Sequence, residues 1–126
     1  MRVPLEMSLP ARPEWDLVAR SVVLSFASSR GVGSVSLGDL GMVCGQIWEE
    51  IANSPGVTTA SVQASRQGAS IHLEVTGTGE GEPIPDELGG WSSQVARAVV
   101  GHLSQNVSIS RSRNSVRIKA EFPIRA

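Results

Sequence analysis

Residues 47–53 read Ile-Trp-Glu-Glu-Ile-Ala-Asn, and the interpretation of the chain depends on this stretch. It continues an apolar helical pattern, so Glu49 and Asn53, four residues apart, lie on one face of a helix. If that face lines a nucleotide pocket, Asn53 helps to hold a phosphate-bound magnesium ion and Glu49 orients or deprotonates an attacking hydroxyl. Both residues lie off the main apolar stripe, so a solvated helix face is the alternative for both.

The helix around this stretch is expected to begin at Ser36, with Asp39 in a capping-box-like position, and to end at Pro55 and Gly56. Asn53 then falls in its last turn. The apolar stripe of this helix consists of Leu37, Leu40, Val43, Cys44, Ile47 and Ile51. Cys44, the single cysteine, is therefore expected to be a buried small hydrophobe, and a lone cysteine fits a reducing cytoplasm.

Two further helical stripes and several strands are predicted on either side of this helix. The stripes contain Trp15, Val18, Val22 and Phe26, and Trp91, Val95, Val99 and Leu103. Alternating apolar residues predict strands at 3–9, 60–64, 71–75, 107–109 and 116–122, and His72 points to the surface of its strand. The order β-α-α-β-β-α-β-β over residues 1–126 predicts a single α+β domain. This domain is a two-layer sandwich whose mixed, mostly antiparallel sheet carries three helices on one face.

The composition narrows the classes of function. The 126 residues suit one domain with one core, and the net charge of −1 gives no general case for nucleic-acid binding. No apolar run approaches the ~20 residues that span a bilayer, and the N-terminus lacks the apolar segment of a signal peptide, so we expect a cytoplasmic protein. Basic residues gather near the C-terminus, where Arg111 and Arg113 are candidates for a docking face, with a solvated surface as the alternative.

Residues 77–81 read Gly-Thr-Gly-Glu-Gly, directly after a predicted strand. The segment lacks the Gly-Lys-Ser/Thr ending of a P-loop, and its spacing does not fit a dinucleotide-binding fingerprint. A flexible loop is the better interpretation from spacing alone. One cysteine, two separated histidines and scattered acids give no metal-binding constellation, and no Ser-His-Asp set can be argued.

The order and spacing of these segments resemble the anti-sigma-factor kinases of the sporulation and general-stress type, which belong to the histidine-kinase/Hsp90-like (GHKL) ATPase superfamily. The start of these kinases is similar to residues 9–23, LPARPEWDLVARSVV, and their N-box is similar to residues 49–53. Their first Gly-rich box is similar to residues 75–81, and their closing strand is similar to residues 115–123. The resemblance implies ATP and magnesium as cofactors, with Glu49 as catalytic base and Asn53 as magnesium ligand. It also places Gly77, Gly79 and Gly81 at the nucleotide.

Three departures from the family pattern weaken the implied ATP site. Gly77 stands where the family has an aspartate that bonds the adenine amino group, and a missing buried polar partner costs about 1–3 kcal/mol. Residues 54–56, Ser-Pro-Gly, end the helix early. Four acids between residues 80 and 90 would repel a triphosphate.

We therefore expect a bacterial regulator with a degenerate GHKL fold and impaired or lost ATP binding, resembling an anti-sigma factor. The resemblance implies a sigma factor, a STAS-domain anti-anti-sigma protein, or both as partners. It also suggests that the domain forms a homodimer. Two alternatives stay open, namely an active ATP-dependent serine kinase that phosphorylates its STAS-domain antagonist, and a scaffold module that has kept only the fold. Neither direct nucleic-acid binding nor membrane binding is expected.

Overall fold

The computed structural model describes residues 4–79, 90–112 and 114–125. The strands within these ranges are β1 (Leu5–Pro10), β2 (Val57–Gln67), β3 (Ser70–Gly79), β4 (Gln105–Arg111) and β5 (Ser115–Pro123). The helices are a short 3-10 helix η1 (Pro13–Trp15) and the α-helices α1 (Asp16–Ser29), α2 (Ser34–Ala52) and α3 (Gln94–Leu103).

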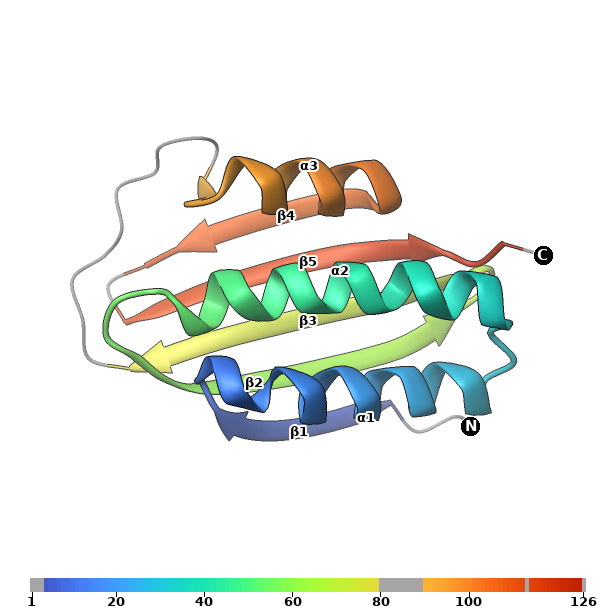
Figure 1. Cartoon of the computed structure of the whole chain (residues 1–126), viewed down its shortest axis with the longest axis horizontal. Helices are drawn as coiled ribbons and strands as arrows, with labels where there is room; N and C mark the ends of the chain where they lie inside the picture. The colour runs from blue at the N-terminus through green and yellow to red at the C-terminus, as the bar shows by residue number, and fades with distance from the viewer. Residues whose placement is uncertain (1–3, 80–89, 113, 126) are drawn as a thin grey trace.

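The five strands form one sheet in the order β1-β2-β3-β5-β4. The three α-helices lie on one face of this sheet, with α2 across its middle and α1 and α3 on either side (Figure 1). The opposite face carries no helix from the described part of the chain (Figure 1). The predicted two-layer α+β sandwich is confirmed, and each described strand pair is antiparallel.

The core lies between α2 and the three central strands. Period-two alternation points one set of side chains from each strand toward the helices. The central strands bury Ala60, Val62, Ala64, Ile71, Leu73, Val75, Val116, Ile118, Ala120 and Phe122. Helix α2 covers them with Leu40, Val43, Ile47 and Ile51, each of them 0% exposed. Burying a side chain of this size contributes about 1.5–3 kcal/mol, so this layer supplies most of the driving force for folding.

The helix stripes predicted for the two outer helices are wrong by one position. Helix α1 buries Ala19, Val23 and Ala27, whereas Val18 is 42% exposed. Helix α3 buries Ala96 and Val100, whereas Val95 is 66% exposed. In both helices small residues face the sheet, because they let the helix axis approach the strands closely. The larger residues beside them are left on the flanks.

The expected N-terminus of α2 is also wrong. The helix begins at Ser34 with Gly33 as its N-cap, and no side chain caps it. Ser36 is 1% exposed and lies inside the helix. Its hydroxyl accepts a hydrogen bond from the backbone N–H of Arg125 at 2.9 Å and donates one to the carbonyl of Arg125 at 3.1 Å. Ser36 therefore fastens the segment after β5 to the start of α2.

Candidate functional site

The structure places Glu49 and Asn53 on the solvent-exposed face of α2, near its C-terminal end. Asn53 is the C-cap residue, and its side-chain amide donates to the backbone carbonyl of Glu49 at 2.9 Å. The amide thus satisfies one of the last carbonyls of the helix, which is a common task at a helix end. The pair is together as predicted, and its described geometry is that of a helix terminus.

Gly77 lies in the buried part of β3, opposite Ala60 on β2 and Val116 on β5. A Cβ atom added at Gly77 would lie 2.8 Å from a methyl carbon of Ile51 and 2.8 Å from one of Val57. Real Cβ atoms do not approach other carbons this closely. The position from which an adenine-binding carboxylate would extend is therefore filled by the core.

Gly79 is fixed by backbone packing. A Cβ atom there would lie 2.0 Å from the carbonyl oxygen of Gly56 and 2.9 Å from the amide nitrogen of Thr58. The Gly79 amide donates to the carbonyl of Asn114 at 3.1 Å. A close approach between two backbones thus accounts for glycine at this position. Gly81, the third glycine predicted at the nucleotide, lies outside the described residues.

The residue of α2 that turns toward the other elements is Glu50, one position after Glu49. Its side chain is 0% exposed, and its carboxylate accepts hydrogen bonds from the backbone amides of Ser92 at 3.1 Å and Ser93 at 3.3 Å. The Ser92 hydroxyl donates to the same carboxylate. Ser93 is the N-cap of α3, and its own side chain accepts from the amide of Ala96. The Glu50 carboxylate therefore sits at the N-terminus of α3.

Arg111, at the end of β4, completes this cluster. Its side chain is 6% exposed, and Nη2 donates to Oε2 of Glu50 at 3.0 Å. Its Nε donates to the carbonyl of Gly90 at 2.7 Å, and Nη1 donates to Oγ of Ser54 at 3.3 Å. Arg111 was predicted to lie on an exposed docking face. This prediction is wrong, because the Arg111 guanidinium is buried in an ion pair with Glu50. Arg113, its predicted companion, lies outside the described residues.

The helical periodicity of the sequence also indicates that Glu50 is buried. Residues 43, 47, 50 and 54 follow the i, i+4, i+7, i+11 spacing of one helix face, so Glu50 and Ser54 continue the stripe of Val43 and Ile47. A carboxylate on a buried stripe must be paired and hydrogen-bonded, because an isolated buried charge is strongly unfavourable. The periodicity predicts the burial, but it does not identify Arg111, which is 61 positions away.

Two apolar hollows lie on the helix layer, one on each side of Met42. The first has a volume of about 330 Å³ between α1 and α2 and is lined by Leu17, Arg20, Ser21, Leu24, Leu37, Gly38, Gly41 and Met42. The second, of about 470 Å³, lies between α2 and α3 and is lined by Met42, Ala98, Val99, His102 and Leu103. Met42 is 54% exposed and Leu17 is 66% exposed, although both are apolar. We call this region, with its two hollows, the Met42 surface.

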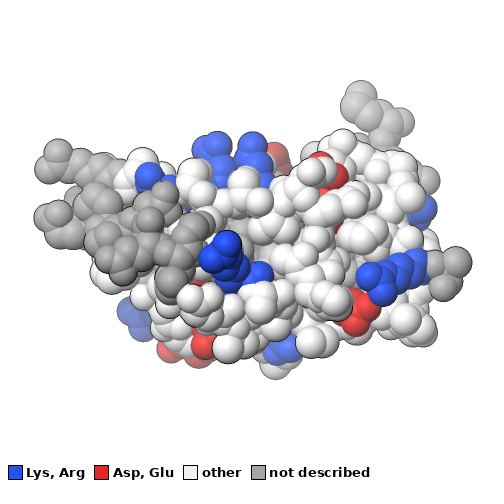
Figure 2. Space-filling model, turned by 90° about the horizontal axis from the view of Figure 1, so that it is seen from above, with Lys and Arg blue, Asp and Glu red and all other residues white. Residues whose placement is uncertain are grey.

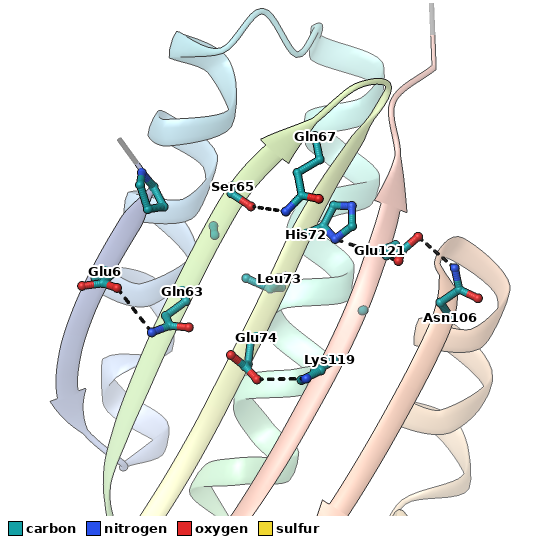
Figure 3. A pocket seen from close by; sticks show the side chains of 13 residues that line it. Glu6, Gln63, Ser65, Gln67, His72, Leu73, Glu74, Asn106, Lys119 and Glu121 are labelled. Carbon is teal, nitrogen blue, oxygen red and sulfur yellow. Dashed lines mark hydrogen bonds and ion pairs between the residues drawn. The ribbon is translucent and has the colours of Figure 1, made fainter. Parts of the chain in front are cut away.

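A third hollow, of about 340 Å³, lies on the helix-free face of the sheet and has a polar lining (Figure 3). Its side chains bind one another. The Glu74 carboxylate lies 3.7 Å from Nζ of Lys119, and Asn106 donates to the Glu121 carboxylate at 2.9 Å (Figure 3). His72 points into this hollow, away from the core, as predicted, and its Nδ1 lies 3.9 Å from Glu121 (Figure 3).

Among the described residues we searched for metal-ligand clusters and for helices that could span a membrane. Within them no group of three or more His, Cys, Asp or Glu side chains is arranged to hold a metal ion. None of the helices in the described ranges is long and apolar enough to cross a membrane. Seen from the edge that carries α3 and β4, uncharged residues cover most of the surface of the described residues, and the charged side chains among them form small, separate groups (Figure 2).

Comparison with known proteins identifies the fold. No family model matches the sequence, and no curated protein matches it. A crystal structure of the RsbU and RsbW domains of Rv1364c from Mycobacterium tuberculosis is similar to this chain with a TM-score of 0.74 at 13% sequence identity. The match covers 98% of this chain and 33% of that chain, so the present chain spans about a third of the solved one. At this identity the likeness shows the fold alone, and that fold is the two-layer α+β sandwich expected from the sequence.

Proposed function

We propose that this domain is a bacterial regulator that acts by binding another protein through the Met42 surface. The observation that carries the proposal is the pair of apolar hollows on the helix layer, with Met42 exposed between them. Exposed apolar patches of this kind are typical of surfaces that another protein covers. Methionine is well suited to such a surface, because its flexible, polarisable side chain adapts to different partners.

The closed packing around Gly77 favours this function over the kinase alternative. A kinase needs space for adenine and an acceptor for its amino group, whereas Ile51 and Val57 occupy the space beside Gly77. The Glu50 carboxylate already accepts from the backbone amides of Ser92 and Ser93 just before α3, so these amides are not free to bind a nucleotide phosphate. ATP and magnesium are therefore not expected as cofactors of this domain.

The partner classes follow from the resemblance in sequence to anti-sigma-factor kinases. A sigma factor or a STAS-domain protein is the proposed partner, and capture of a sigma factor is the proposed regulatory act.

The test compares two variants of one helix. Wild-type protein is titrated with each purified sigma factor and STAS-domain protein of the source bacterium, and binding is followed by calorimetry. We expect at least one complex, and we expect Met42→Glu to weaken it by at least about 10-fold, because a charge is desolvated at the centre of the interface. Val35→Glu is the matched control, since Val35 is 73% exposed on α2 and lines neither hollow.

Val35→Glu should leave the affinity within about twofold of wild type. Equal weakening by both variants, or no complex with any member of the two classes, would reject the Met42 surface as the docking site.

Titration with Mg-ATP at millimolar nucleotide decides against the kinase alternative if it gives no heat. A saturable heat would instead favour the kinase.

A further inference from the structure

The carboxylate of Glu50 is held in the way that proteins hold a bound anion. Two consecutive backbone amides, those of Ser92 and the N-cap residue Ser93, donate to it from the two positions just before the ten-residue helix α3. The hydroxyl of Ser92 and the guanidinium of Arg111 add two further donors. An anion at this position also faces the positive end of the α3 helix dipole, which favours negative charge.

The donors belong to different parts of the chain from the carboxylate that they bind. Ser92 lies 42 positions from Glu50 in the sequence, and Arg111 lies 61 positions away. The first precedes α3 and the second ends β4, whereas Glu50 extends from α2. The same backbone amides and guanidinium could bind a carboxylate of a separate molecule, because none of these donors belongs to the helix that carries Glu50. Glu50 is thus an internal ligand at the junction of three elements.

We propose that the amides of Ser92 and Ser93 and the guanidinium of Arg111 form a carboxylate-binding site that the chain keeps filled with its own Glu50. The site has two functions in the folded protein. It neutralises the buried charge of Arg111, and it joins the C-terminal end of α2 to the start of α3 without a diffusible ligand.

Burial makes this contact decisive for stability. The Glu50 side chain is 0% exposed and the Arg111 side chain is 6% exposed, so both charges are removed from water in the folded protein. Removing one partner of a buried pair leaves an uncompensated charge, which costs far more than the net contribution of the intact pair. Arg111 and the α3 amides should then recruit an external carboxylate of suitable size.

The test is chemical rescue of Glu50→Ala. This substitution removes the carboxylate and leaves space for formate or acetate beside Arg111. Thermal unfolding is measured at constant pH and ionic strength in sodium chloride, sodium formate and sodium acetate. In chloride, we expect the Tm of Glu50→Ala to fall by about 10–20 °C relative to wild type. At about 100 mM formate or acetate it should rise again by roughly 5 °C, as expected for a weakly bound ligand of the folded state.

Three controls separate a bound carboxylate from a general salt effect. Glu49→Ala changes the exposed neighbour of Glu50. For this variant, and likewise for wild type, the Tm in formate and in acetate should agree with its Tm in chloride to within about 1 °C. Glu50→Gln fills the space with an uncharged amide, so it should be destabilised without being rescued. The double variant Glu50→Ala, Arg111→Ala should lose the rescue, because the cationic donor is gone.

Equal shifts in wild type and Glu50→Ala, or a rescue that persists without Arg111, would overturn the proposal. If Glu50→Ala does not fold in chloride, the variant is refolded from urea in formate and in chloride, and the recovery of folded protein in the two salts is compared. Recovery in formate but not in chloride supports the site, and failure in both rejects it. These readouts are independent of partner binding, so they do not depend on the proposed regulatory function.

Discussion

Gly77 lies where the packing around β3 leaves no room for a side chain. A side chain there would collide with Ile51 and Val57 at 2.8 Å, and it would also approach Val116 at 3.3 Å. We therefore expect Gly77→Asp to lower the free energy of unfolding by about 3 kcal/mol or more. Overpacking accounts for about 1–3 kcal/mol of this loss, and the unpaired buried carboxylate accounts for the rest. Urea denaturation measures the loss, and calorimetry with Mg-ATP shows whether the aspartate creates binding.

Gly101→Ala is the matched control for this substitution. Gly101 lies in α3, and no atom lies within 4 Å of a Cβ atom built there. Replacing an exposed helical glycine by alanine should raise stability by about 0.5–1 kcal/mol. If Gly77→Asp kept wild-type stability and bound ATP, the packing around β3 would be adaptable and the kinase alternative would regain support.

The residues of the candidate site were predictable in part. Glu49 and Asn53 are four residues apart on α2, as their spacing requires, and both are exposed. The neighbouring pair, Glu50 and Ser54, faces the interior because a rotation of 100° per residue separates adjacent positions by more than a quarter turn. Sequence periodicity contains this information. What it lacks is the partner, since Arg111 reaches Glu50 through the order of the strands and not through local spacing.

The elements themselves follow from the sequence more securely than their buried faces. Alternation in β3 and β5 and the stripe of α2 predicted these elements, because large apolar residues on them are buried. The two outer helices bury alanines, which carry a weak hydrophobic signal, so the larger residues beside Ala19 and Ala96 were mistaken for the core face. Close packing against the sheet selects small residues there, and that selection depends on tertiary contacts.

The contact between α2 and the chain after β5 gives a prediction for a whole element. Ser36 and Arg125 are 89 positions apart, and the Ser36 hydroxyl both accepts from and donates to the backbone of Arg125. Ser36→Ala should leave these backbone groups unpaired and cost about 1–2 kcal/mol. Hydrogen exchange should show faster exchange of the Arg125 amide, together with a lower urea midpoint.

Ser34→Ala provides the comparison for Ser36. Ser34 is exposed in the first turn of α2, and Gly33 is the N-cap, so its substitution should change stability by less than about 0.5 kcal/mol. Equal effects of the two substitutions would indicate that Ser36 acts through helix propensity and that its contact with Arg125 contributes nothing.

At the scale of the molecule, the order of elements was sufficient to predict a sheet with its helices on one face. The strand order β1-β2-β3-β5-β4 follows from antiparallel neighbours and a single crossing by α3. The fold is shared at 13% identity with the solved RsbU and RsbW domain structure, which indicates how few residues the architecture requires. Function is less constrained than fold, because it depends on which side chains fill or leave open the spaces between the layers.

Cys44 reports on the integrity of these layers. It lies in the core on α2, where burial raises the pKa of its thiol from 9.0 to about 12; of the nearby charges, Arg20 lowers this pKa and Asp16 raises it. The unfolded chain loses this proton near its ordinary pKa, whereas the folded protein keeps it until about pH 12. Between these pH values the unfolded state binds fewer protons. The free energy of unfolding should therefore fall by about 1.4 kcal/mol per pH unit.

Urea denaturation of wild type and Cys44→Ala, under reducing conditions from about pH 7 to pH 11, measures this contribution. Other alkaline titrations are few, because the chain contains no tyrosine and Lys119 is its single lysine. The difference in unfolding free energy between the two proteins should be constant below about pH 8.5 and should decrease steadily above about pH 9. A difference that stays constant up to about pH 11 would mean that water reaches Cys44 in the folded state. The contact between α2 and the sheet would then be looser than the burial of this thiol indicates.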